Sequence, residues 1–174
     1  LFVENTKGGL DYYLADEVTV SDDGLTYHVH LNDKATWSDG VPVTVDDLLF
    51  NINRRILKYG SSSFLRVNGE DATYEVIDEK TIEFHLASPY AYYIATLSGL
   101  TPYPSHVFDN DPQKMIDDTT MFTKPGFVTS GLYVVSEINA DNIVFTARDD
   151  YYRGVPQVKT VVMKVIGSGS TKTI

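Results

Sequence analysis

Two histidines separated by a single residue, His28 and His30, form the spacing in this chain that best suits metal chemistry. Residues two positions apart on a β-strand point to the same side, so both imidazoles would project from one face. A third ligand from a neighbouring strand would complete a metal site, or a site that activates water in a hydrolase. The plainer interpretation, which we favour, is that these are polar residues on the outward face of an amphipathic strand.

Other catalytic signatures fail on spacing. The chain has no cysteine and only four histidines, and no serine lies in a Gly-x-Ser-x-Gly elbow. The run Asp109–Asp111 begins like a calcium loop, but Lys114 and Thr120 occupy the positions that require Gly and Glu. The segment Gly167–Thr173 lacks the glycine that precedes lysine in a phosphate-binding loop. We therefore expect no catalytic residues, no cofactor and no resident metal, and predict that the chain is not an enzyme.

The overall composition narrows the class of protein further. The 174 residues are 43% hydrophobic and carry a formal net charge of -10, with an isoelectric point near 4.7. This is too apolar for a disordered chain, and no uninterrupted apolar run is long enough to span a bilayer. The acidic balance repels phosphate backbones, so nucleic acid is not an expected partner.

A β-hairpin is predicted over residues 16–31. The turn is Ser21–Gly24, where aspartate side chains bond to the backbone and glycine accepts a positive φ. The run after the turn alternates between apolar and polar residues, which is typical of a half-buried strand. The apolar face consists of Leu25, Tyr27, Val29 and Leu31, and the polar face of Thr26, His28 and His30.

A helix is predicted to begin at Thr44 and to end at Gly60. Thr44 and Asp47 have the spacing of a capping box, and glycine is the usual C-terminal stop. The apolar residues that recur at helical spacing are Val45, Leu48, Leu49, Ile52 and Ile56. Arg54, Arg55 and Lys58 are interpreted as cations that suit the negative end of the helix dipole.

The remaining pattern alternates hairpins with short helices. Hairpins are expected at residues 74–86 and 133–148, short helices at 90–97 and 111–118, and a last strand at 158–165. Strands that follow one another as hairpins, with few helices between them, predict an α+β fold with a mostly antiparallel sheet.

Three segments, taken in order, resemble one family. They are residues 15–31 (ADEVTVSDDGLTYHVHL), residues 35–50 (ATWSDGVPVTVDDLLF) and residues 129–165 (TSGLYVVSEINADNIVFTARDDYYRGVPQVKTVVMKV). Together they are similar to the family 5 extracellular solute-binding proteins, which capture oligopeptides, dipeptides, nickel complexes and similar solutes for ABC importers. The core W-S-D-G-x-P-V-T-x-D-D is the most specific part of the match.

The resemblance implies a type II periplasmic-binding-protein fold, of which this chain supplies an amino-terminal fragment. Residues 1–15 would be a strand or connector of the first main lobe, residues 16–128 the small family-specific lobe, and residues 129–174 return strands into the first main lobe. The second main lobe and the export signal would lie outside this chain. In the whole protein, two lobes would close on the ligand by a hinge motion, as in a venus flytrap.

The resemblance also implies a function, a location and partners. The protein would be an extracytoplasmic subunit, either periplasmic or a lipoprotein on the outer face of the cell membrane. It would work as a monomer that takes up a small molecule or peptide, most readily an oligopeptide or dipeptide, and delivers it to the permease subunits of an ABC transporter. A His-dependent hydrolase or metal-binding protein using His28 and His30 is the alternative.

Six residues are carried over as candidate ligand contacts. Phe64 falls where the family often presents an aromatic toward the ligand, and Tyr103 ends the segment Leu100–Tyr103, which precedes Pro104–Phe108 and is expected to face the cleft. Residues 129–133 match the family segment G-T-G-P-Y, although Thr129 replaces the first Gly and Leu132 replaces Pro. The full set is Phe64, Tyr103, Thr129, Ser130, Gly131 and Tyr133.

Overall fold

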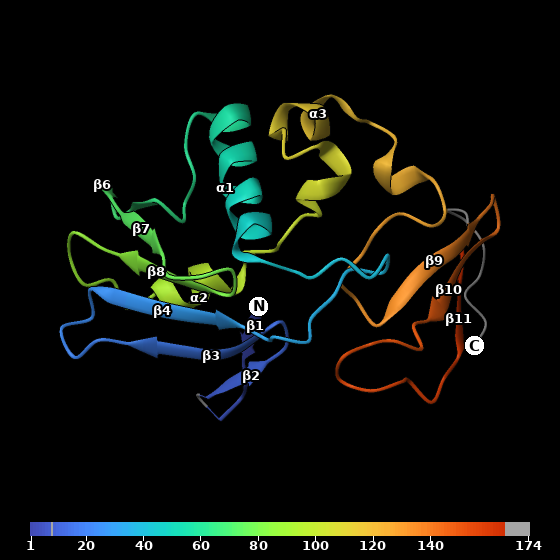
Figure 1. The fold of residues 1–174 in the computed structure, drawn as a ribbon, viewed down its shortest axis with the longest axis horizontal. Coiled ribbons are helices and arrows are strands. Elements are labelled where there is room, and N and C mark those ends of the chain that lie inside the picture. Colours follow the sequence, from blue (N-terminus) through green and yellow to red (C-terminus); the bar gives the residue numbers. More distant parts are fainter. Residues whose placement is uncertain (8, 166–174) are drawn as a thin grey trace. The chain divides into compact units, whose positions relative to one another are not determined.

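The computed structural model describes residues 1–7 and 9–165, which form two compact units (Figure 1). The larger unit consists of residues 1–35 and 42–117, and the smaller unit of residues 36–41 together with the chain from residue 118 onward. Each unit contains an antiparallel sheet of its own. The Gly167–Thr173 segment of the sequence analysis lies outside the described residues.

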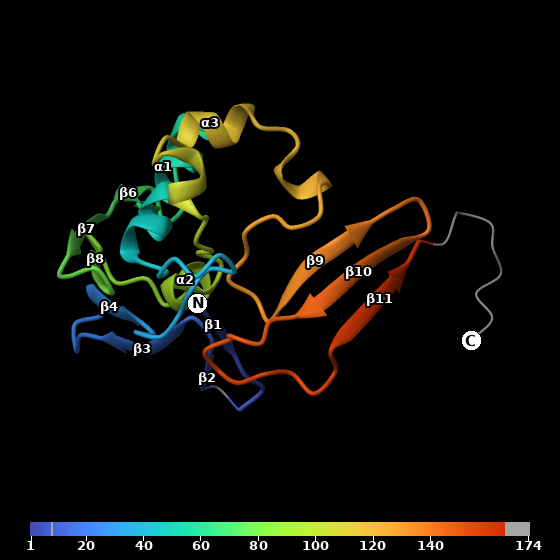
Figure 2. The ribbon, with the colours of Figure 1, turned by 45° about the vertical axis from the view of Figure 1, so that its right-hand side comes forward.

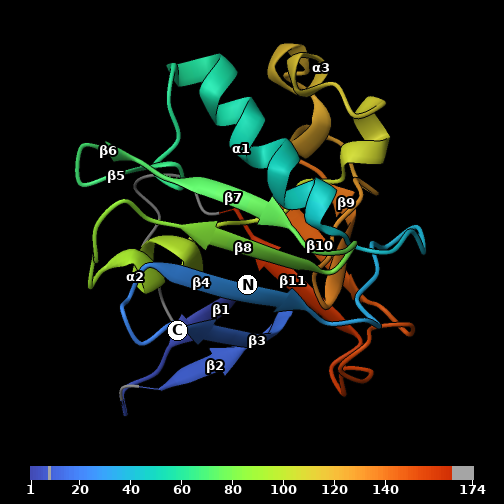
Figure 3. The same cartoon turned by 60° about the vertical axis from the view of Figure 1, so that its left-hand side comes forward.

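The sheet of the larger unit has four antiparallel strands (Figure 3). In spatial order they are β3 (Ala15–Val20), β4 (Thr26–Leu31), β8 (Thr81–His85) and β7 (Thr73–Val76). The two predicted hairpins are thus confirmed, and β4 and β8 join them in the middle of the sheet.

One face of this sheet forms the core of the larger unit. Val29 and Ile82 lie opposite each other on β4 and β8, as do Tyr27 and Phe84, and all four side chains are buried. Tyr93 packs edge-on against Tyr27, with ring centroids 4.8 Å apart, and contacts Phe84 in the same way. The predicted alternation of β4 is therefore confirmed, because its other face carries only partly exposed residues.

Helix α1 (Val45–Tyr59) has the predicted ends. Thr44 is the N-cap, and its backbone N–H donates to Oδ2 of Asp47 at 3.0 Å within a complete capping box. Gly60 ends the helix in the left-handed region at φ 75°, and its N–H donates to the carbonyl of Ile56.

The two halves of α1 differ in burial. Val45, Leu48 and Ile52 are fully buried, as their spacing predicts, and Phe50 stacks on Phe108 with centroids 5.9 Å apart. Ile56 shares the helical spacing of these residues, but its side chain is 38% exposed. All buried residues of the helix precede residue 53, so its last two turns face solvent.

Shorter elements complete the larger unit. The helices expected near residues 90–97 and 111–118 are present as α2 and α3. Two small hairpins, β1–β2 and β5–β6, were not predicted, because strands of two or three residues carry no readable period. These elements are β1 (Phe2–Glu4), β2 (Leu10–Tyr12), β5 (Arg66–Val67), β6 (Glu70–Asp71), α2 (Tyr93–Ser98), η1 (Ser105–Phe108) and α3 (Pro112–Asp117).

The smaller unit is built on a three-stranded antiparallel meander (Figure 2). Its strands are β9 (Tyr133–Ile138), β10 (Asn142–Ala147) and β11 (Thr160–Lys164), and a 3₁₀ turn, η2 (Met121–Thr123), precedes them. The predicted third hairpin and last strand are confirmed. The α+β class with mostly antiparallel sheet is confirmed as well, and no helix among the described residues is long and apolar enough to cross a membrane.

Candidate functional site

The predicted ligand contacts fall in both units. Phe64 and Tyr103 belong to the larger unit, whereas Thr129, Ser130, Gly131 and Tyr133 belong to the smaller unit. Within the larger unit, Phe64 and Tyr103 lie on either side of one short stretch of α1. Within the smaller unit, the other four residues form one strip that leads into β9.

Helix α1 fixes the position of Tyr103. The backbone N–H of Tyr103 donates to the carbonyl of Asp47 at 3.2 Å, and that of Ser105 donates to the Asp47 carboxylate at 3.0 Å. The side-chain amide of Asn51 donates to the carbonyl of Thr101 at 2.7 Å. Three hydrogen bonds therefore hold residues 101–105 along the buried half of the helix and leave the Tyr103 ring half-exposed.

Phe64 lies deeper than a direct ligand contact would require. Its side chain is 4% exposed, and its backbone carbonyl accepts a hydrogen bond of 2.8 Å from the hydroxyl of Tyr93. The guanidinium carbon of Arg55 lies 5.4 Å from the centroid of the Phe64 ring. A solute that approached here would meet Arg55 rather than the aromatic ring.

Two consecutive arginines of α1, Arg54 and Arg55, each contact one of these two candidate residues. The guanidinium carbon of Arg54 lies 4.9 Å from the Tyr103 centroid, and Arg55 covers Phe64, so each cation is held by an aromatic ring. In the part of the chain that the structure describes, neither arginine forms an ion pair, and the Nε atom of each is buried without a hydrogen-bond partner. Their guanidinium groups thus keep donors for a ligand.

Sequence reasoning missed this role, although a signal was present. Arg54 and Arg55 were interpreted only as cations suited to the end of a helix. In a chain with net charge -10, however, no acidic residue stands three or four positions before or after either of them. Because such neighbours are the local ion-pair partners available on a helix, their absence indicates that these arginines have no ion pair along the helix and contact groups from other segments.

A hollow on the surface of the larger unit adjoins Arg55. It encloses about 510 Å³ and is lined by Arg55, Tyr59, Ser61, Ser63 and Arg66, which we call the arginine hollow. Arg66 is held by Asp71, with 2.6 Å between its Nη1 and the carboxylate oxygen. Two guanidinium groups and two serine hydroxyls thus border one space directly after the end of α1.

In the smaller unit, the strip from Thr129 to Tyr133 is tied to a distant segment. The backbone N–H of Thr129 donates to the hydroxyl of Ser38 at 3.2 Å, and the N–H of Ser38 donates to the Thr129 carbonyl at 2.9 Å. The N–H of Gly131 donates to Oγ1 of Thr129, and the Tyr133 hydroxyl donates to the carbonyl of Val158 at 2.9 Å. Ser130 is half-buried beside them.

Arg148 holds this arrangement together. Its side chain is only 3% exposed, and it donates to the carbonyls of Thr36 and Trp37 at 3.0 and 2.9 Å. It also donates to both carboxylate oxygens of Asp150, at 3.0 and 2.9 Å, and these bonds hold the pKa of Asp150 below its usual value. The strip at Thr129 is therefore a rigid backbone surface.

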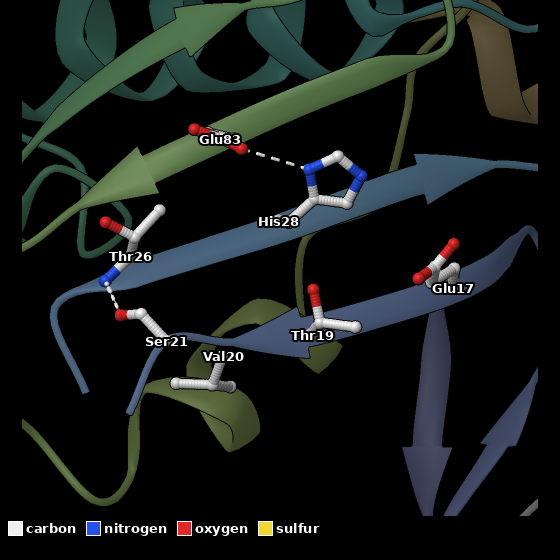
Figure 4. A pocket seen from close by; sticks show the side chains of 7 residues that line it. All are labelled: Glu17, Thr19, Val20, Ser21, Thr26, His28 and Glu83. Atoms are coloured by element: carbon white, nitrogen blue, oxygen red, sulfur yellow. Dashed lines mark hydrogen bonds and ion pairs between the residues drawn. The ribbon is translucent and has the colours of Figure 1, made fainter. Parts of the chain in front are cut away.

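The two histidines lie on the outward face of the four-stranded sheet, where His28 borders a shallow pocket (Figure 4). Nδ1 of His28 is 3.1 Å from Glu83, and Nδ1 of His30 is 2.6 Å from Asp16. The hydrogen bond that the His30 ring donates to the Asp16 carboxylate raises the pKa of His30. Among the described residues, no three His, Asp or Glu side chains are grouped so that they could hold a metal ion. The geometry thus gives no support to a metal site at His28 and His30.

Comparison with known proteins now places the chain. Residues 10–173 match the family described as bacterial extracellular solute-binding proteins, family 5. The chain is 31% identical over 149 residues to a periplasmic alpha-galactoside-binding protein of Rhizobium meliloti, a match that covers 76% of this chain and 21% of that protein. It is also 31% identical over 162 residues to a protein of Brucella ovis named for ABC-transporter peptide binding. This match covers 92% of this chain and 29% of that protein.

The fold agrees with the sequence match. A crystal structure described as that of a peptide-binding protein, AppA, from Clostridium difficile superposes with a TM-score of 0.81 at 28% identity, covering 97% of this chain and 35% of that one. The chain belongs to the family 5 bacterial extracellular solute-binding proteins, and it has the fold of a fragment of a type II periplasmic binding protein. It spans between a fifth and a third of the length of these curated relatives.

Proposed function

We propose that this chain is part of an extracytoplasmic solute-binding subunit of an ABC importer, which captures a solute and delivers it to the permease. The observation that carries the proposal is the superposition of 97% of the chain on the Clostridium difficile peptide-binding protein. The family match over residues 10–173 supports it. In this role the protein binds without catalysis, as a monomer outside the cytoplasm.

An oligopeptide or dipeptide is the proposed solute. The relatives named for peptide or dipeptide binding cover 84–98% of the chain, whereas the alpha-galactoside-binding relative covers 76%. The arginines on α1 favour peptides as well, because a peptide carries a carboxylate and a galactoside is neutral.

The lobe assignment is proposed as the family resemblance implies. Residues 16–128 would be the small lobe, and residues 1–15 and 129–174 would belong to the first main lobe. We also propose that Tyr103, Thr129, Ser130, Gly131 and Tyr133 contribute to the ligand surface, and that Phe64 acts through Arg55, since its own ring is covered.

Protein-observed NMR of the full chain tests the function, because a third of a binding protein is expected to bind only at millimolar concentrations. Trialanine is titrated as the peptide and raffinose as the α-galactoside. We expect trialanine to shift the amide signals of residues 61–66 and 101–105 in a saturable manner and raffinose to leave them unchanged. Saturable shifts with raffinose alone, or with neither solute, would contradict the proposal.

A further inference from the structure

The arginine hollow is a positively charged site in an acidic protein. The chain has 14 basic and 24 acidic residues, yet Arg54, Arg55, Lys58 and Arg66 occur within a short span. Of these, only Arg66 has an acidic partner among the described residues. Lys58 lies over the Tyr59 ring instead. The local positive charge is therefore not neutralised by the protein itself.

One of the two arginines that border the hollow is packed in place before any ligand arrives. Arg55 lies against the buried Phe64 ring, whereas Arg66 pairs with Asp71 at 2.6 Å and both side chains of that pair are exposed. The Arg55 cation therefore loses less conformational entropy on binding than a free surface arginine would. The hydroxyls of Ser61 and Ser63 line the same hollow and add donors beside the guanidinium groups.

We propose that the arginine hollow binds a carboxylate group of the transported solute, with Arg55 as its main contact. The guanidinium fork matches a carboxylate in shape and charge and can donate two parallel hydrogen bonds. A carboxylate fits better than a phosphate, because Asp71 already compensates one of the two arginines and leaves about one net positive charge. The carbonyl end of α1 lies beside the hollow and weakens anion binding, which also favours the singly charged group.

This inference rests on the proposed function and narrows it: the solute carries a free carboxylate, as the C-terminus of a peptide does.

The test is an NMR titration of the full chain with succinate, trialanine, trialanine amide and inorganic phosphate. The Nε–H signal of Arg55 and the amide signals of residues 61–66 are followed. The variants are Arg55→Gln and, as a matched control, Lys114→Gln, which removes an exposed cation of the same unit that is paired with Asp109.

We expect succinate and trialanine to shift these signals, and trialanine amide to bind about tenfold more weakly. Arg55→Gln should raise the Kd for succinate about tenfold, whereas Lys114→Gln should leave it unchanged. The inference is overturned if succinate leaves the Arg55 signal unmoved, if amidation has no effect, or if phosphate binds more tightly than succinate. Trialanine binding that is insensitive to Arg55→Gln would overturn the inference while preserving the proposed function. Succinate binding without trialanine binding would contradict the proposed peptide solute, and with it the inference that the hollow serves the transported solute.

Discussion

Arg148 should contribute more to the stability of the smaller unit than any surface ion pair. Arg148→Met removes the hydrogen bonds to the carbonyls of Thr36 and Trp37. The Thr36 carbonyl loses its Arg148 donor, whereas the Trp37 carbonyl loses one charged hydrogen bond, worth about 1.5–3 kcal/mol, and still accepts from the Gly40 N–H. Each unsatisfied buried acceptor costs about 1–3 kcal/mol. The bonds to Asp150 add little, because this carboxylate is 58% exposed and can return to water. The expected loss is therefore about 3 kcal/mol.

Urea unfolding followed by fluorescence measures this loss directly, because Trp37 is the only tryptophan and accepts one of the Arg148 bonds. With a slope of about 1–3 kcal/mol per molar urea, Arg148→Met should lower the midpoint by about 1–3 M. Arg148→Lys should lose about half as much, since an ammonium group cannot reach both carbonyls and both carboxylate oxygens.

The matched control is Lys159→Met. Lys159 pairs with Asp149 at 3.0 Å, but both side chains are exposed, so the change should cost about 0.5 kcal/mol or less. An Arg148→Met midpoint that equals that of the control would refute the reasoning. Equal losses for methionine and lysine at position 148 would show that the guanidinium hydrogen-bond geometry matters and that a positive charge alone does not.

Three further changes test the larger unit. Gly60→Ala should lower the free energy of unfolding by about 1 kcal/mol in thermal unfolding, because Gly60 has a φ of 75°. Gly99→Ala should cost less, because Gly99 has a φ of -81°. Equal effects would contradict the role of the left-handed cap. Asp47→Ala removes a helix cap and the bond to the Ser105 N–H, so a loss of about 2 kcal/mol is expected by calorimetry, and a loss below about 0.5 kcal/mol would argue against this account. The pKa of His30 is raised in the folded chain by its bond to Asp16. The stability that this pair contributes is therefore fully present below the unfolded pKa of 6.5 and is lost as the pH rises through the folded pKa. The melting temperature should fall across this pH range in the native chain and should fall less in Asp16→Asn. Identical pH profiles of the two proteins would contradict a stabilising His30–Asp16 pair.

Much of the fold could be predicted because local chemistry and tertiary packing agree. Helix α1 begins at the predicted Thr44 and ends at the predicted Gly60, since capping groups act within a few residues of themselves. Strand β4 follows its alternation because one face of the sheet is buried. Ile56 keeps the predicted helical spacing and is nevertheless exposed, because spacing shows which residues share a helix face and cannot show where the packing against that face stops.

The candidate site could be predicted only in part. The family resemblance pointed to Phe64, but its burial under Arg55 depends on the loop after α1, which folds back onto the helix. The contacts of Arg148 with Thr36 join residues 112 positions apart, and no local pattern encodes such a pair. The titrations above test Phe64 and Tyr103, and the four predicted contacts of the smaller unit remain a prediction.

The division of the chain has a consequence for the order of folding. Residues 36–41 belong to the smaller unit, yet the larger unit continues from residue 42 to residue 117. During synthesis from the N-terminus, the larger unit is complete before Arg148 has left the ribosome. The carbonyls of Thr36 and Trp37 therefore form their hydrogen bonds with Arg148 only later. Closing a loop of this length is a slow step. Trp37 fluorescence should therefore reach its native value after the amides of the larger unit have become protected from exchange.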